Sequence, residues 1–327
     1  MQNLPVQYQD ILDAVPRVNE VLSPTPLYEW KGLSNLIGCR FFLKHENHQP
    51  VGAFKVRGGI NLIGTLSAEE KERGIVGCST GNHGQSLAFA CKHFGVKCTI
   101  VVPQANNPDK NRAIQNLGAT LVEKGHDFDA AKEYLERELM PQGFRYVHSA
   151  NEPMLIAGVG TYALEIFDKL PRVDFIFVPI GLGSGVAGTC IVAKSIHSDC
   201  QLIGVQAENA PSMVQSWREK SLYPTETAKT WAEGLATRTP AEVTLQIMQK
   251  LMDDAVLVTE DELRRGVYSI LRHTHNVAEG AGAAAVVAAF KMRDQLQGKT
   301  VVGVLSGGNL DLNELPAVLE AGELRDV

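Results

Sequence analysis

The chain has 327 residues, of which 44% are hydrophobic and 21% are charged, and its formal net charge is −6. This length predicts about two domains, because it exceeds what one compact core usually supports. The negative charge and the lack of a basic block argue against a nucleic-acid partner and favour an enzyme that acts on small molecules.

Three further features predict a cytoplasmic protein without a membrane partner. Residues 1–10 are polar and lack the apolar core of a signal peptide. The longest apolar stretch, near 283–290, is well short of the roughly 18 residues that a membrane span needs. The six cysteines form no C-x-x-C pair, and we expect them to be reduced core thiols.

Runs rich in Val, Ile and Phe alternate with helical patterns in chain order. We predict strands at 40–44, 75–78, 97–102, 120–123, 174–179, 201–206 and 300–305. The main helices are expected at 53–66, 84–94, 108–117, 127–139 and 186–196. Continuous apolar strands that alternate with helices indicate an α/β fold with mainly parallel sheets.

We expect two domains, each with an open, mainly parallel twisted sheet flanked by helices. The small domain is predicted at 75–152 and the large domain at 1–74 plus 153–327, with the strand at 40–44 free to join either sheet. The active site is then expected in the cleft between the domains, a common place for ligand sites.

A glycine-rich loop follows the predicted strand at 174–179 and opens the helix at 186–196. Residues 181–188 read Gly-Leu-Gly-Ser-Gly-Val-Ala-Gly. Glycines let backbone N–H groups approach an anion, and a helix N-terminus adds partial positive charge, so the loop predicts a phosphate site. The alternatives are a tight turn without a ligand and a dinucleotide site, because Gly183, Gly185 and Gly188 form a G-x-G-x-x-G pattern followed by Glu208.

Lys55 lies in the first turn of the helix predicted at 53–66. The helix dipole disfavours an added positive charge there, and Ala53, Phe54 and Val56 surround the side chain with apolar groups. Both effects lower an amine pKa and leave more free amine for attack on a carbonyl. A surface lysine whose stem covers apolar neighbours is the alternative.

Two other turns at strand ends carry hydroxyl groups. In the segment 78–85, Ser79, Thr80 and Asn82 are suited to hold a carboxylate together with exposed N–H groups, or simply to cap a helix. His83 in the same segment is interpreted as a structural hydrogen-bonding residue. Ser306 in Leu-Ser-Gly-Gly-Asn offers a neutral hydroxyl, or belongs to an ordinary turn.

Together the four motifs resemble the fold-type II pyridoxal-phosphate enzymes, whose fold is that of the tryptophan synthase β subunit. Within that group the chain is most similar to the threonine/serine dehydratase and serine racemase family. The resemblance runs from Pro24-Thr25-Pro26-Leu27 to Ser306-Gly307-Gly308-Asn309. It implies pyridoxal 5'-phosphate as the cofactor and a homodimer or homotetramer as the assembly.

The resemblance also assigns roles to residues. Lys55 would carry the cofactor as a Schiff base and remove the α-proton of the substrate, with Ser79 and Thr80 as the other catalytic residues. The remaining cofactor-binding residues would be Phe54 beside the ring, Asn82 at its phenolic oxygen, Ser306 at its pyridine nitrogen, Gly181, Leu182, Gly183, Ser184 and Gly185 at the phosphate, and the flanking Gly234 and Glu279. The substrate carboxylate would lie against Ser79, Thr80, Gly81, Asn82 and His83.

The implied reaction is that of an ammonia-lyase, also called a dehydratase, which converts L-threonine, L-serine or a related β-hydroxy amino acid to a 2-oxo acid and ammonia by β-elimination. The cofactor would act as an electron sink. A neutral Ser306 does not keep the pyridine nitrogen protonated as a carboxylate would, which favours elimination over transamination.

Two positions depart from the family pattern. Thr80 replaces the second serine of the racemases and has different rotamer preferences, so serine racemisation is kept as the alternative. The positions of the family's divalent-metal loop hold Gln206, Ala210 and Ser212. Because neutral side chains are poor ligands for Mg²⁺ or Ca²⁺, no metal site is expected, although Glu208 lies close by.

The identity of the β-substituent stays open, since the free energy by which a pocket distinguishes such substrates is only about 1–3 kcal/mol per methylene. A dehydratase of threo-3-hydroxyaspartate or phenylserine is a further alternative. An NAD-dependent oxidoreductase and a non-catalytic binding protein are more distant ones. The short stretch after Asn309 leaves no room for the regulatory domain of biosynthetic threonine dehydratases, so feedback control is not expected.

Overall fold

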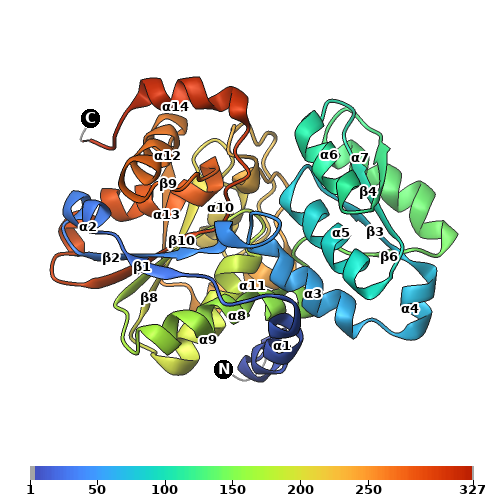
Figure 1. Ribbon diagram of the computed structural model, residues 1–327, viewed down its shortest axis with the longest axis horizontal. Helices are drawn as coiled ribbons and strands as arrows, with labels where there is room; N and C mark the ends of the chain where they lie inside the picture. Colours follow the sequence, from blue (N-terminus) through green and yellow to red (C-terminus); the bar gives the residue numbers. More distant parts are fainter. Residues whose placement is uncertain (1–3, 326–327) are drawn as a thin grey trace.

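The computed structural model describes residues 4–325, which form two sheets flanked by helices (Figure 1). The strands are β1 (Leu27–Glu29), β2 (Arg40–His45), β3 (Ile75–Cys78), β4 (Cys98–Val102), β5 (Thr120–Glu123), β6 (Arg145–Tyr146), β7 (Phe175–Pro179), β8 (Gln201–Ala207), β9 (Asp254–Val258) and β10 (Thr300–Leu305).

The helices precede and follow these strands along most of the chain. They are α1 (Tyr8–Val21), α2 (Lys31–Ile37), α3 (Lys55–Thr65), α4 (Ala68–Arg73), α5 (Asn82–Phe94), α6 (Pro108–Asn116), α7 (Phe128–Tyr134), α8 (Pro153–Lys169), α9 (Ser184–Ile196), α10 (Ser212–Glu219), α11 (Glu242–Leu251), α12 (Glu260–Thr274), α13 (Gly280–Lys291) and α14 (Leu315–Ala321). Within residues 4–325, none of the helices combines the length and the apolar character that a membrane crossing requires.

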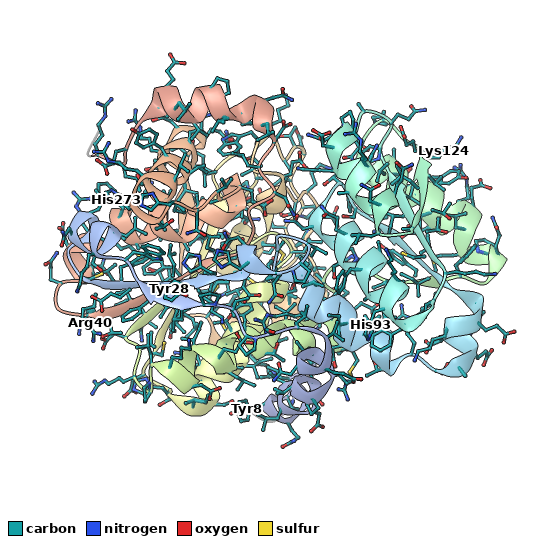
Figure 2. All side chains as sticks on the ribbon, viewed as in Figure 1. Tyr8, Tyr28, Arg40, His93, Lys124 and His273 are labelled. Atoms are coloured by element: carbon teal, nitrogen blue, oxygen red, sulfur yellow. The ribbon has the colours of Figure 1, made fainter. Side chains whose placement is uncertain are left out.

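The larger sheet has six strands in the order β1-β2-β10-β7-β8-β9. All of its pairings are parallel except that between the edge strand β1 and β2. Successive residues of a strand point to opposite faces, so Val301 packs with α2, α12, α13 and α14, whereas Val302 packs with α1, α8, α9 and α11. Both faces of this sheet are therefore buried, as expected of a parallel sheet, and Figure 2 draws the side chains that lie between the strands and the helices.

The smaller sheet has the order β5-β4-β3-β6, and all of its pairings are parallel. Ile75 and Ile100 face α5, whereas Val76, Cys78 and Val101 face α7. Figure 1 shows this sheet with α5, α6 and α7 as the teal-to-green part on the right. Helix α3 packs against both α5 and α8 and so joins the two parts of the molecule.

The α/β class with two parallel-rich sheets is confirmed. Each predicted strand is present within about one residue at either end, and the strand at 40–44, left open above, pairs with β10 in the larger sheet. The helix predicted at 127–139 ends as an α-helix at Tyr134 and continues as a π-turn over Leu135–Leu139. Strands β1, β6 and β9 were not predicted. The smaller sheet lies within 75–152, and the domain boundaries proposed there stay a prediction.

Candidate active site

A cavity of about 690 Å³ opens at the carboxyl ends of strands from both sheets, between the two parts of the molecule. Ligand sites of open α/β sheets lie at this edge, because the loops that follow the strands converge there. All of the residues predicted above to form the site line this one cavity: Phe54, Lys55, Ser79, Thr80, Gly81, Asn82, His83, Gly181, Leu182, Gly183, Ser184, Gly185, Gly234, Glu279 and Ser306. The roles assigned to them stay predictions.

Lys55 is the first residue of α3 and extends into the cavity. Its Nζ donates hydrogen bonds to Ser149 O at 3.1 Å and to Ser184 Oγ at 3.0 Å. Within residues 4–325 this amine has no carboxylate partner, and burial alone accounts for the shift of its pKa. Burial lowers the pKa of Lys55 to about 8, so an appreciable fraction of the amine is free near neutral pH.

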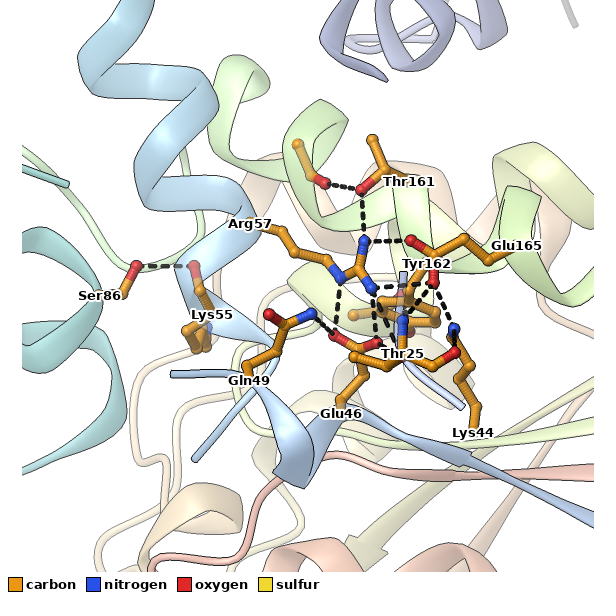
Figure 3. A network of polar contacts seen from close by, with 12 residues as sticks. Thr25, Lys44, Glu46, Gln49, Lys55, Arg57, Ser86, Thr161, Tyr162 and Glu165 are labelled. Atoms are coloured by element: carbon orange, nitrogen blue, oxygen red, sulfur yellow. Dashed lines mark hydrogen bonds and ion pairs between the residues drawn. The ribbon is translucent and has the colours of Figure 1, made fainter. Parts of the chain in front are cut away.

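The start of α3 is held in place on both sides of the Lys55 side chain. Ser86 Oγ on α5 donates to the Lys55 carbonyl at 2.6 Å. On the other side, the guanidinium of Arg57 donates to both oxygens of Glu46, at 2.7 and 2.9 Å, and to both oxygens of Glu165, at 2.7 and 3.0 Å (Figure 3). The backbone that carries Lys55 is thus tied to the loop after β2 and to α8.

The charges in this buried cluster balance. Lys44 forms an ion pair with Glu165, so that two cations meet two carboxylates, and the side chains of Lys44, Arg57 and Glu46 are 0% exposed. Burial alone would raise the pKa of Glu46, but the charge and hydrogen bonds of Arg57 overcome it and lower the pKa below its ordinary value. The paired charges and their hydrogen bonds therefore stabilise one arrangement of three chain segments.

The glycine-rich loop has the backbone geometry of an anion site. Gly183 is the N-cap of α9, with φ of 90°, a left-handed conformation that favours glycine. A Cβ atom on Gly181 would lie 2.4 Å from the carbonyl oxygen of Gly234, so only glycine fits there. The first residues of α9, Ser184 and Gly185, line the cavity, and Ser184 Oγ accepts from the amine of Lys55. The start of this helix therefore lies at the cavity, where a helix N-terminus suits an anion.

The loop at 79–83 closes another wall of the cavity. Ser79 Oγ accepts hydrogen bonds from Gly81 N at 3.1 Å and Gly84 N at 2.9 Å, so its hydroxyl stabilises the turn, as the capping alternative expected. His83 is buried, its Nε2 lies 3.4 Å from Val147 O, and its Nδ1 has no partner within the described chain. Because burial lowers the pKa of His83 to about 3, the ring is neutral at physiological pH.

The amide of Asn82 belongs to a short chain of hydrogen bonds. Its Nδ2 donates to Glu279 Oε1 at 2.7 Å, and its Oδ1 accepts from Asn309 Nδ2 at 2.7 Å. Burial raises the pKa of Glu279 to about 7. Asn309 had no assigned role in the sequence analysis, although it ends the Leu-Ser-Gly-Gly-Asn motif.

Charged residues at the outer part of the cavity were also missed. Lys110 forms an ion pair with Glu233 at 2.7 Å, and Arg238 forms one with Asp129 at 2.5 Å. All four side chains line the cavity and link its two sides. They belong to no motif, and a charged residue on a helix or in a loop is ordinarily read as solvated, so only the tertiary structure reveals them.

The positions of the family's metal loop hold a network of neutral groups. Gln206 Nε2 donates to Thr237 Oγ1 at 3.2 Å, Gln206 Oε1 accepts from Val214 N at 3.0 Å, and Ser212 Oγ donates to Thr237 O at 2.8 Å. In the described part of the chain, no three His, Cys, Asp or Glu side chains gather where they would hold a metal ion.

These observations fit pyridoxal phosphate. A partly neutral amine without a carboxylate partner offers a group for a carbonyl, and the glycine loop at a helix N-terminus suits a phosphate. The cavity is large enough for a ring with a bound amino acid. The donors that line the cavity also match an aromatic ring with one oxygen and one nitrogen acceptor, which Asn82 and Ser306 would meet.

Comparisons with known proteins agree with this geometry. Residues 18–307 match the family model described as "Pyridoxal-phosphate dependent enzyme". The L-threonine ammonia-lyase of Thermotoga maritima is 38% identical over 317 residues, which cover 97% of this chain and 79% of that protein. The processed threonine deaminase isoform 2 of Solanum lycopersicum superposes with a TM-score of 0.92 at 31% identity, covering 97% of this chain and 93% of the other. A serine racemase from Dictyostelium discoideum gives a TM-score of 0.87 at 31% identity, covering 94% and 99%.

Proposed function

The chain belongs to the family of pyridoxal-phosphate-dependent enzymes, and from that premise we propose that it is an ammonia-lyase that converts L-threonine or L-serine to a 2-oxo acid and ammonia. The name of the relative from Thermotoga maritima and that of the tomato structure support L-threonine as the substrate. The observation that carries the proposal is the amine of Lys55, buried without a carboxylate partner beside the glycine loop.

Different residues of the cavity would hold different parts of the cofactor. When bound, pyridoxal phosphate supplies an electron sink for the negative charge that develops at the α-carbon. Backbone N–H groups of the loop at 181–185 and the N-terminus of α9 would bind its phosphate. Asn82 would donate to the phenolic oxygen, Ser306 would face the pyridine nitrogen, and Phe54 would pack beside the ring.

Lys55 would perform the proton transfer. Lys55 would hold the carbonyl carbon of the cofactor until the amine of the substrate replaces it there. The freed Nζ would then accept the proton from the α-carbon of the substrate, and burial, which lowers its pKa to about 8, keeps part of the amine neutral to act as a base. Ser149 O and Ser184 Oγ both lie within hydrogen-bond distance of Nζ, so they limit its motion inside the cavity. The loop at 79–83 would hold the substrate carboxylate with its N–H groups, and the Thr80 hydroxyl on the same wall would take part in proton movement.

Racemisation is the second candidate function, because Thr80 offers a hydroxyl to the cavity where the racemases place a serine. A β-branched threonine has fewer χ1 rotamers than serine, which limits how far that hydroxyl reaches. The match of residues 18–307 to a family of pyridoxal-phosphate enzymes favours that cofactor over the dinucleotide alternative. Gly188 packs against α8, where a Cβ atom would lie 2.9 Å from Gly160 Cα, and such close packing is common to both kinds of site.

We propose further that the protein works in the cytoplasm as a homodimer or homotetramer. The six cysteines are buried and free, which is the state expected of a reducing compartment. The homo-oligomer is supported by family resemblance and by the prevalence of two-fold assemblies among soluble enzymes. Light scattering coupled to gel filtration measures the assembly, and a mass of one chain would exclude it.

Release of oxo acid tests the proposed activity. The purified protein, loaded with pyridoxal phosphate, is incubated in parallel with L-threonine, L-serine, D-serine, threo-3-hydroxyaspartate and phenylserine. The proposal expects rapid formation of 2-oxo acid from L-threonine or L-serine, and Lys55→Ala serves as the inactive control. If none of the five substrates yields an oxo acid, the lyase proposal is wrong, and a chiral assay of serine then tests racemisation.

A further inference from the structure

The side-chain amide of Asn82 is held between two other side chains, one at each end. Glu279 accepts from its nitrogen and Asn309 donates to its oxygen, each at 2.7 Å. The three residues come from separate segments, namely the start of α5, the residue before α13, and the loop after β10. This relay runs along the wall of the cavity, because Asn82 and Glu279 both line it.

The orientation of the Asn309 amide follows from its partners. Its Nδ2 also donates to Val51 O at 2.9 Å, and a backbone carbonyl oxygen only accepts hydrogen bonds. Both N–H groups of Asn309 are therefore committed, one to Val51 and one to Asn82. Gly52 packs directly against this amide, since a Cβ atom there would lie 2.6 Å from Asn309 Oδ1. Asn309 thus has one defined orientation.

That orientation fixes Asn82 in turn. Rotation of the Asn82 amide by half a turn would place two N–H donors against each other at Asn309, whose orientation is fixed by Val51 O. It would also place two oxygens against each other at Glu279 whenever that carboxyl is ionised. In the observed orientation, Asn82 Oδ1 is occupied and one of its N–H groups is used, which leaves the second N–H group as a donor for a ligand. In this orientation the amide therefore has an N–H donor to spare for a ligand in the cavity, which Asn82 lines.

We propose that Asn309 is a positioning residue, which holds the Asn82 amide so that an N–H group, and not the carbonyl oxygen, meets the phenolic oxygen of the cofactor. This inference rests on the proposed function, because the orientation of Asn82 matters only if a ring oxygen binds there. The donated hydrogen bond stabilises the ionised phenolic oxygen. An Asn82 amide free to rotate would present its own oxygen, and the phenolic oxygen would then retain its proton.

The test replaces Asn309 and compares it with a matched asparagine elsewhere. Asn309→Asp keeps the size of the side chain but removes both donors, and Asn309→Ala removes the amide without adding a charge. Asn61→Asp is the control: Asn61 is buried, its Nδ2 donates to Met154 O at 2.7 Å, its Oδ1 accepts from Arg17 Nε at 2.7 Å, and it does not line the cavity.

Three quantities are measured for each variant, namely the dissociation constant of pyridoxal phosphate, the visible absorption spectrum of the loaded protein, and the melting temperature of the cofactor-free protein. Loss of one charge-assisted hydrogen bond should raise the dissociation constant of Asn309→Asp roughly tenfold, with a smaller rise for Asn309→Ala. Both variants should shift absorbance toward the shorter-wavelength form with a protonated phenolic oxygen. The Asn61 control should lower the melting temperature and leave the spectrum unchanged.

The outcomes separate the two proposals. If both Asn309 variants keep the wild-type spectrum and bind the cofactor within about twofold of wild type, the positioning role is refuted while the proposed function stands. A spectral shift of the same size in Asn61→Asp would likewise refute it, because the effect would then reflect general loosening. If the wild-type protein itself forms no visible band with pyridoxal phosphate, the proposed function fails, and the role of Asn309 fails with it.

Discussion

Replacement of Arg57 by methionine should destabilise the fold more than the loss of any surface ion pair would. The guanidinium is 0% exposed and holds Glu46, also 0% exposed, through hydrogen bonds of 2.7 and 2.9 Å. Without Arg57, the cluster keeps one cation, Lys44, beside two carboxylates. Because Lys44 pairs with Glu165, the uncompensated charge falls on Glu46. Removal of one partner of a buried ion pair costs about 3–5 kcal/mol, and we expect Arg57→Met to lose this much.

The double variant Arg57→Met with Glu46→Leu shows whether the cost arises from an unpaired buried charge. It removes one charge of each sign, leaves Lys44 with Glu165, and should recover much of the stability lost by Arg57→Met alone. The free energy of unfolding is measured by urea titration of the cofactor-free protein, followed by circular dichroism. Arg137→Met is the surface control, because the side chain of Arg137 is 72% exposed, and it should change stability by less than about 0.5 kcal/mol. If Arg57→Met lies within about 1 kcal/mol of wild type, or if the double variant is no more stable than Arg57→Met, the cluster does not act as described.

Three further predictions concern the amine, the cluster and the glycine loop. Lys55→Met should abolish turnover. Its cofactor-free form should melt at or above the wild-type temperature, because an apolar chain replaces a desolvated amine that has no ion pair. A clear drop in melting temperature would contradict this. The pKa of Glu46 is lowered on folding, so its contribution to stability is fully present above its unfolded pKa of about 4.3 and is lost as the pH falls from there through its lower folded pKa. Glu46→Gln should therefore weaken the acid dependence of the melting temperature, and an unchanged pH profile would count against it. Gly181→Ala would place a Cβ atom 2.4 Å from Gly234 O, and overpacking of this kind costs about 1–3 kcal/mol. If that cost falls on the bound state, affinity for pyridoxal phosphate should drop by about fivefold to 150-fold in an absorbance titration, and an unchanged affinity would contradict this.

The sequence indicated most of the fold because parallel strands buried on both faces read as continuous apolar runs. The three missed strands lack that signal. β1 is a three-residue edge strand, β6 has two residues, and β9 begins with the exposed Asp254. Their pairing is decided by neighbours that are distant in the chain, which a local pattern does not contain.

The candidate site was predictable where a motif lies on one short segment, as at Lys55, at Asn82 and in the loop from Gly181. It was not predictable where function depends on contacts between segments. Glu165 meets Arg57 across 108 positions of the chain, and Asn309 meets Asn82 across 227. Nothing in one sequence marks such pairs, because each residue taken alone has an ordinary surface or turn interpretation.

Covalent capture of the cofactor tests the central claim, that Lys55 is the amine that carries pyridoxal phosphate. The loaded protein is treated with borohydride, which reduces a Schiff base to a stable secondary amine, then digested and mapped by mass spectrometry. We expect the added mass on the peptide that contains Lys55, and no labelled peptide from Lys55→Ala treated in the same way. A label on another lysine, or none on the wild-type protein, would contradict the account.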